Sequence, residues 1–187
     1  MTIYYQHIGE ILWKRDAPRS IGTKANGVVR FFLHDIERFC SDLTPFERDQ
    51  IRETIQKTAS DGFQIWGIPS GAKVILKNMS KGDFLLLLES MNFRYAGEVL
   101  VRISQPLHLF SKHIWGEERF PIIIFLRGQM ITYGWDQFKE HFGYSKSYRM
   151  RGQTALVADE RVAASPSKSE RAFIAHVLAS SVPSARG

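Results

Sequence analysis

The chain has 187 residues, of which 44% are hydrophobic, so it can form one ordinary domain with a buried core, or one domain with an appendage. Its single cysteine, Cys40, excludes an intramolecular disulfide and suits a reducing compartment. A net charge of +6 favours a polyanionic partner such as nucleic acid.

Neither a membrane span nor a signal peptide is expected. The longest apolar runs, such as residues 122–126, are far too short to cross a bilayer. Residues 2–6 carry no positive charge ahead of their apolar side chains, which a signal peptide would have. These features predict a cytoplasmic protein.

The N-terminal part of the chain mixes apolar and basic side chains before its first regular pattern. Residues 1–27 are expected to form an extension that packs on the domain. Residues 28–33 are rich in β-branched and aromatic side chains, which predicts a strand. After residue 34 the apolar side chains recur at the spacing of one helical face, and Cys40 falls on that face. Cys40 is therefore most simply a core residue.

The next helix has a clear start signal. Thr44 and Glu47 form a capping box, and Pro45 suits the first helical turn. The helix is predicted to run from Pro45 to about residue 58, with an apolar face that includes Ile51 and Ile55.

Five stretches in the middle of the chain are typical of strands. Residues 84–88 form an unbroken apolar run, which predicts a strand buried on both faces. Residues 95–103 alternate more visibly, which predicts one face nearer to water. The other predicted strands are residues 63–68, 121–126 and 129–133, the last two separated by a turn at Arg127 and Gly128.

Helices are predicted at residues 106–115 and 135–142, and a basic, aromatic segment without periodicity follows the second. After Gly152 the composition shifts to Ala, Ser and Val, and a second capping box precedes a short helix. The chain is therefore divided into an N-terminal extension, a central domain and a C-terminal tail or linker, at residues 1–27, 28–151 and 152–187.

Two tryptophans enclose the block of predicted strands. Trp66 ends a short strand beside a Pro/Ser/Gly loop, and Trp115 precedes a polar, charged loop. Such positions can hold an indole at the rim of a pocket, so the two side chains suggest an aromatic clamp for a flat ligand. Core packing is the alternative, because large aromatic side chains dominate cores generally.

Catalytic patterns are missing from the sequence. The six histidines show no spacing typical of a zinc site, so neither a metal nor a cofactor is predicted. A metal-dependent nuclease would need an acidic strand end followed by Glu-x-Lys, but Glu98 is followed by Val99 and Leu100. No glycine-rich phosphate loop or Gly-x-Ser-x-Gly elbow occurs. The sequence predicts a binding protein rather than an enzyme.

Several short motifs, in order along the chain, carry a resemblance to a known family. They are residues 30–33 leading into a helix, Trp66 at a strand end, Gly82-Asp83 before a leucine-rich strand, residues 95–99 opening the next strand, and Trp115 before a hydrophobic strand. The sequence resembles the YTH/EVE branch of the PUA-like superfamily, and in particular the N-terminal domains of modification-dependent restriction proteins. The resemblance implies an α+β fold, in which a curved mixed sheet forms a partial barrel flanked by helices.

The resemblance also implies a function and a site. A modified base, methylated or hydroxymethylated, would be flipped out of DNA into a cage with Trp66 and Trp115 as walls, Phe120 as floor and Ser70 in the adjoining loop. Flipping a base costs a few kcal/mol, and stacking on an aromatic side chain returns roughly 1–3 kcal/mol per base. Two indoles would therefore offset the flip.

Basic residues near the proposed mouth are expected to contact phosphates, which supply sequence-independent affinity. The candidates are Lys73, Lys77, Arg94, Lys112, Arg119, Lys146, Arg149 and Arg151.

The resulting hypothesis is a non-catalytic domain that directs a nuclease or nucleoside triphosphatase, in the same or a partner chain, onto modified DNA. An RNA-binding PUA-like module is the main alternative, and a small enzyme acting on a nucleotide is the other. The sequence does not decide whether the nucleic acid is DNA or RNA, or whether the modified base is adenine or cytosine.

Overall fold

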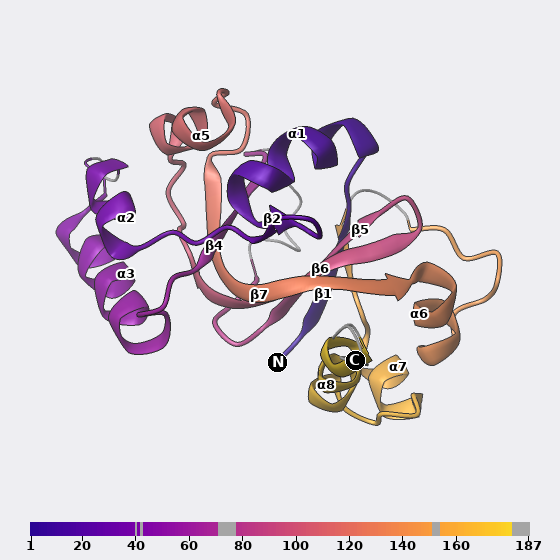
Figure 1. Cartoon of the computed structure of the whole chain (residues 1–187). Coiled ribbons are helices and arrows are strands. Elements are labelled where there is room, and N and C mark those ends of the chain that lie inside the picture. Colours follow the sequence, from indigo (N-terminus) through magenta and orange to yellow (C-terminus); the bar gives the residue numbers. More distant parts are fainter. Residues whose placement is uncertain (40, 42, 71–77, 151–153, 181–187) are drawn as a thin grey trace, which may run out of the picture.

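The computed structural model describes residues 1–39, 41, 43–70, 78–150 and 154–180. The fold is α+β, with a six-stranded mixed sheet flanked by helices, as predicted (Figure 1). The sheet order is β4-β7-β6-β5-β1-β8. These strands comprise β1 (Ile3–His7), β4 (Gln64–Ile68), β5 (Phe84–Glu89), β6 (Asn92–Arg102), β7 (Ile122–Gly134) and β8 (Thr154–Leu156). Among the described strands, β1 and β5 pair in parallel and the other neighbours are antiparallel.

The leucine run of β5 is buried on both faces, which confirms the prediction. Successive strand residues point to opposite faces. Leu85 and Leu87 therefore pack on the side of α1 (Glu10–Ser20), whereas Leu86 and Leu88 pack on the side of α6 (Trp135–His141), α7 (Asp159–Ala164) and α8 (Glu170–Ser180).

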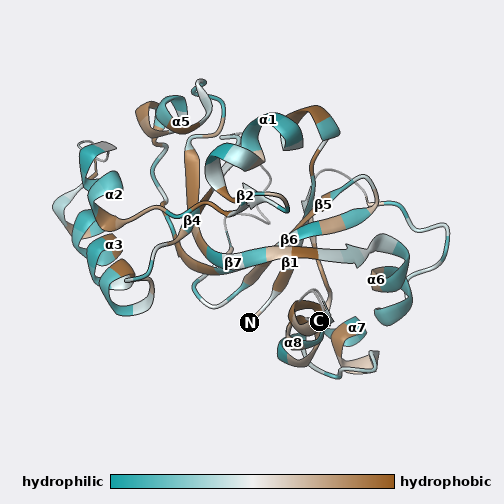
Figure 2. Cartoon of the chain, viewed as in Figure 1, coloured by the Kyte–Doolittle hydropathy of each residue, from teal (hydrophilic) through white to brown (hydrophobic). Residues whose placement is uncertain are grey.

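A third apolar cluster lies at the β4 end of the sheet. There α2 (Leu33–Phe39), α3 (Pro45–Thr58) and α5 (His108–Trp115) pack against β4, β6 and β7. Figure 2 shows the first part of β7 as hydrophobic, whereas α2 and α3 are mostly hydrophilic. The capping box of α3 is confirmed: Thr44 N donates to Glu47 Oε2 at 3.1 Å, and Glu47 N donates to Thr44 Oγ1 at 3.3 Å.

The predicted turn at Arg127 and Gly128 is wrong, because β7 continues through both residues. Gly128 pairs with Gly97 of β6 where the two backbones run very close together. A Cβ atom on Gly128 would lie 2.5 Å from Cα of Gly97, so glycine is required there by the contact between strands. β7 bends strongly along its length instead of ending (Figure 1).

The strand predicted at residues 28–33 is also wrong. Only Gly27–Val28 forms a strand, β3, which pairs with β2 (Gly22–Thr23) in a separate two-stranded sheet. Phe31 makes a single bridge to Phe63, and the chain enters α2 at Leu33. Side chains with high β propensity form a strand only where a neighbouring backbone can pair along its length. The conformation of residues 28–33 is therefore decided by tertiary contacts.

Residues on both sides of the proposed domain boundaries contribute to one sheet. Strand β1 comes from residues 1–27, and it lies between β5 and β8, which comes from the C-terminal segment. The boundaries at residues 27 and 151 stay a prediction. Across the described ranges, no helix is long and apolar enough to span a bilayer.

Candidate functional site

A pocket of about 60 Å³ lies where the C-terminal ends of β1 and β4 meet α1 and the loop after α5. Its wall combines aromatic and aliphatic side chains with a few polar groups, which is the composition of a small-ligand site. The residues that line it are Gln6, His7, Ile8, Gly9, Leu12, Asp16, Trp66, Gly67, Pro69, Trp115, Arg119 and Phe120.

Trp66 is held in a fixed orientation on β4. Its side chain is 5% exposed, and its indole Nε1 donates to Oε1 of Gln6 at 2.9 Å. Gln6 comes from β1 and also lines the pocket. A buried indole N–H requires an acceptor, so this hydrogen bond fixes both side chains at the pocket wall.

Trp115 is the last residue of α5, and its ring packs directly on the backbone of β4. It is 3% exposed. A Cβ atom on Gly67 would lie 2.5 Å from Cζ3 of Trp115 and 2.7 Å from Cβ of Phe120. Phe120 meets the indole edge to face, with ring centroids 5.8 Å apart. Gly67 therefore leaves room for the Trp115 ring against β4.

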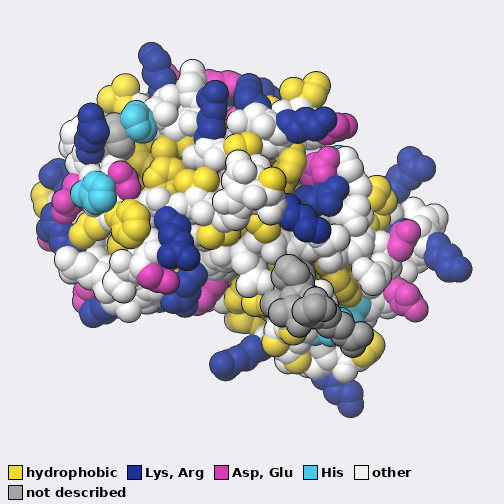
Figure 3. Space-filling model, viewed as in Figure 1, with side chains coloured by type: hydrophobic (Ala, Val, Ile, Leu, Met, Phe, Trp, Pro, Cys, Tyr) yellow, Lys and Arg dark blue, Asp and Glu magenta, His cyan; other side chains and the backbone are white. Residues whose placement is uncertain are grey.

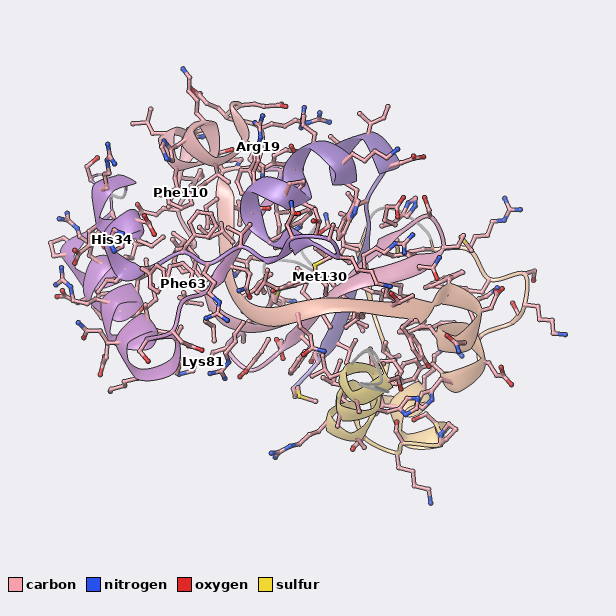
Figure 4. The ribbon with its side chains drawn as sticks, viewed as in Figure 1. Arg19, His34, Phe63, Lys81, Phe110 and Met130 are labelled. Atoms are coloured by element: carbon pink, nitrogen blue, oxygen red, sulfur yellow. The ribbon has the colours of Figure 1, made fainter. Side chains whose placement is uncertain are left out.

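Helix α1 is tied to the segment that carries Trp115. Arg19 lies between α1 and α5 (Figure 4), where its Nη1 donates to the Trp115 carbonyl oxygen at 3.1 Å. Arg15 forms an ion pair with Glu117 in the loop after α5. These two arginines hold α1 over the pocket.

Asp16 brings a carboxylate to an otherwise largely apolar wall. It is 3% exposed and accepts from Arg15 Nε at 2.6 Å and from Arg15 Nη2 at 2.9 Å. Burial of a charge without a partner is costly, and the guanidinium group offsets that cost. A carboxylate has about four lone-pair positions, so Asp16 retains acceptor capacity beyond these two bonds.

The structure brings four of the predicted site residues together. Trp66, Trp115 and Phe120 line the same pocket, and Arg119 joins them there with its guanidinium 5.6 Å from the Phe120 ring centroid. Ser70 is exposed and does not line the pocket, whereas its neighbour Pro69 does.

The remaining basic candidates are spread over different surfaces. Lys112 pairs with Glu118 near the α5 end of the pocket, at 3.8 Å. Arg94 pairs with Glu89 beside the β5–β6 turn, at 3.0 Å. Figure 3 shows Lys and Arg side chains over α1 and α5, with acidic side chains among them.

Lys146 and Arg149 lie beside a second pocket, described below. The other three basic candidates, Lys73, Lys77 and Arg151, lie outside the described residues.

Sequence reasoning missed the pocket residues of the N-terminal segment, above all Gln6, Leu12 and Asp16. The apolar run around Tyr4 and Tyr5 was the available signal for a central strand. No local pattern places Gln6 against a tryptophan 60 residues away.

Comparisons with known proteins concern the fold. No protein-family model matches the sequence, and no curated protein matches it. The chain is similar to a solved structure described as the N-terminal domain of Thermococcus gammatolerans McrB bound to m5C DNA. The two share 16% sequence identity and a TM-score of 0.61, over 87% of this chain and 94% of that chain. This likeness confirms, for the fold, the predicted resemblance to such N-terminal domains.

Proposed function

We propose that this chain is a non-catalytic domain that recognises a modified base in DNA, flipped into the pocket between Trp66 and Trp115. The observation that carries the proposal is the meeting of two indoles, from separate elements, with a polar edge in one pocket. The similar McrB domain was solved bound to DNA containing m5C, which supports DNA as the ligand. The sheet would then serve as the PUA-like partial barrel that presents this pocket.

The chemistry of the pocket suits an aromatic heterocycle that carries an amino group. Stacking on an aromatic side chain contributes roughly 1–3 kcal/mol per base, against a flipping cost of a few kcal/mol. Carboxylates accept from the exocyclic amine of cytosine. Asp16 would therefore favour a modified cytosine or adenine over a thymine, and an added methyl group would contact the apolar wall.

The pocket in its present form is smaller than a ligand site that holds a drug-sized molecule, which spans roughly 300–1,000 Å³. For a base to enter, the loop at residues 116–121 would therefore have to move outward, away from α1. The Arg15–Glu117 ion pair joins those two parts and would be rearranged by that movement.

Phosphate contacts would supply the affinity that does not depend on sequence. Arg119 lies at the pocket itself, Lys112 lies near it on α5, and the net charge is +6. The biological role would be to direct a nuclease or nucleoside triphosphatase, in the same or a partner chain, onto modified DNA.

Leu12→Trp tests the proposal by filling the pocket. Leu12 lines the pocket, whereas its neighbour Ile11 on α1 is 82% exposed and does not. Ile11→Trp is therefore a matched control, with the same new side chain one residue away. Affinities are measured for paired duplexes with 5-methylcytosine, 5-hydroxymethylcytosine, N6-methyladenine or the unmodified base, and for single-stranded RNA.

We expect the wild type and Ile11→Trp to prefer one modified duplex and Leu12→Trp to bind modified and unmodified duplexes alike. A wild type without any preference would contradict the proposal. Tighter binding to RNA than to every duplex would favour the RNA-binding alternative. Circular dichroism of both variants checks that the fold is retained.

A further inference from the structure

A second, larger pocket of about 540 Å³ lies beside the β5–β6 turn, between the N-terminal end of α6 and the segment at residues 146–150. Its volume falls within the range of small-ligand sites. The wall includes Trp135, Tyr148 and Met150, and basic side chains stand at its edge. Neither the aromatic clamp nor the similarity to the McrB domain accounts for this pocket.

The aromatic wall of this pocket is rigidly supported. Tyr148 stacks on Trp135 with ring centroids 5.9 Å apart and on Tyr144 with centroids 4.3 Å apart. The hydroxyl groups of Tyr148 and Tyr5 are 3.0 Å apart, within hydrogen-bond distance, and the guanidinium of Arg161 lies 4.1 Å from the Tyr144 ring centroid. The surface that a ligand would meet is therefore preorganised.

The basic side chains of the pocket divide into two kinds. Lys139 is buried, and its ammonium group donates to the Lys146 carbonyl oxygen at 2.7 Å and pairs with Asp136 at 2.8 Å. This lysine holds the segment in place. Lys146 and Arg149 are exposed, and within the described residues neither side chain has an ion-pair or hydrogen-bond partner. Two cations are thus left at the edge of the pocket.

The two pockets meet at His7. This residue ends β1 and lines both of them, directly after Gln6, which binds the Trp66 indole. The His7 side chain is exposed. A strand whose base occupied the first pocket would therefore continue past His7 to the second.

An apolar side chain is held at the edge of the second pocket in a strained turn. Ser90 and Met91 form the two-residue connection between β5 and β6, with φ of 45° and 62°. Side chains rarely adopt this left-handed region, which glycine occupies without cost. Met91 is nevertheless 56% exposed at the pocket edge. Its flexible, polarisable side chain suits contact with a base or sugar.

We propose that the second pocket binds the nucleotide adjacent to the flipped base in the same strand. Lys146 and Arg149 contact its phosphates, and Met91 with the aromatic wall contacts its sugar and base. A basic edge with an aromatic wall is the arrangement by which proteins bind single-stranded nucleic acid. The inference rests on the proposed function, since it requires a base in the first pocket.

The test compares the binding of a single nucleotide with the binding of a strand. The probes are the modified mononucleotide, 5-methyl-dCMP or N6-methyl-dAMP, and a short single strand with the same base at its centre. The double variant Lys146→Ala/Arg149→Ala is compared with Lys57→Glu, which changes the net charge by the same amount. Lys57 is an exposed residue of α3, which lies at the opposite end of the molecule from α6 (Figure 1).

We expect the double variant to bind the strand about tenfold more weakly. The salt dependence of binding should fall by about 1.4 in slope, about 0.7 for each of the two phosphate contacts on a single strand. Mononucleotide binding should not change. Two outcomes would overturn the proposed role of the second pocket: equal losses of strand affinity in the double variant and Lys57→Glu, or loss of mononucleotide binding in the double variant. Neither outcome would contradict the proposed function, as long as the wild type prefers the modified base. A wild type without that preference would overturn the proposed function and this inference together.

Met91→Gly provides a second, independent test. Glycine relieves the left-handed turn, so the melting temperature should rise, whereas strand affinity should fall because the side chain is lost. If strand affinity is unchanged in a variant that melts higher, Met91 makes no contact with the nucleotide and the proposal is wrong.

Discussion

Two clusters that contain aromatic side chains lie on different parts of the sheet and are built in very different ways. The filled cluster, Phe93, Phe138, Phe142 and Phe173, is almost entirely shielded from solvent, with neighbouring ring centroids 4.7–5.9 Å apart. The pocket cluster, Trp66, Trp115 and Phe120 with Gln6 and Asp16, leaves a cavity and places polar groups at its wall.

The difference shows that aromatic content alone does not identify a site. Phenylalanines that interlock contribute stability and have no hydrogen bonds to offer. In the pocket cluster a glycine leaves room for the Trp115 ring, and a carboxylate and an amide line the same pocket as the two indoles. Unfilled space next to fixed polar groups is what a flat, polar ligand requires.

The largest expected effect concerns the filled cluster. Phe138→Ala should cost about 3–5 kcal/mol of unfolding free energy, which lowers the melting temperature by roughly 6–20 °C for a chain of this size. Below the melting transition, the preference for modified over unmodified duplex should remain, as titrations at low temperature would show. Loss of that preference in the folded variant would mean that the two clusters are not independent.

The next effect concerns the pocket cluster. Trp115→Ala should weaken binding to modified duplex by about tenfold to a hundredfold, while weak binding to unmodified duplex survives through phosphate contacts. The buried ring also supports the fold, so affinities must be compared at temperatures where circular dichroism shows a folded variant. A parallel loss of both affinities in folded protein would identify the indoles as core packing alone.

A smaller effect is expected at the rim of the pocket. Arg119→Ala and Lys112→Ala should each weaken binding to modified and unmodified duplexes by the same factor. Each should also reduce the salt dependence of binding by about 1 in slope. Titrations over a range of salt concentrations measure this slope. A salt-independent affinity in the wild type would show that the basic surface does not contact phosphates.

The smallest effect is a pH dependence at the edge of the filled cluster. Burial, and secondarily the charge of His176, lowers the pKa of His141, whose Nε2 lies 2.9 Å from Ser167 Oγ. The unfolded chain then binds the proton more tightly than the folded one. Stability is retained above the ordinary histidine pKa of about 6.5 and is partly lost as the pH falls through the lowered folded-state pKa.

His141→Gln should remove this part of the pH dependence. Melting temperatures of wild type and variant are compared across the mildly acidic range. Curves that stay parallel would show that His141 does not titrate with folding.

Sequence patterns predicted the elements whose signals are local. The Thr44–Glu47 capping box set the start of α3, and the leucine run of β5 predicted burial on both faces. Trp66 and Trp115 were selected from their place at element ends, and both line the pocket. Their role in binding stays a prediction.

Sequence patterns failed where a contact between distant segments decided the outcome. Gly128 resembles a turn residue in the sequence, but it permits β7 to pass close to β6. Residues 28–33 have strand-forming side chains and no continuous partner strand. The N-terminal segment gave no sign that Gln6 and Asp16 would form part of the pocket.

By itself, the sequence determined which side chains avoid water and where several helices and strands begin, because hydrophobic period and capping chemistry act over a few residues. Only the tertiary structure decided the central place of β1, the Gln6–Trp66 hydrogen bond and the packing of Trp115 on Gly67. The hydrophobic pattern of the sequence indicates that a side chain will be buried and will need a packing or hydrogen-bond partner. The partner itself is chosen when the whole sheet and its helices pack together.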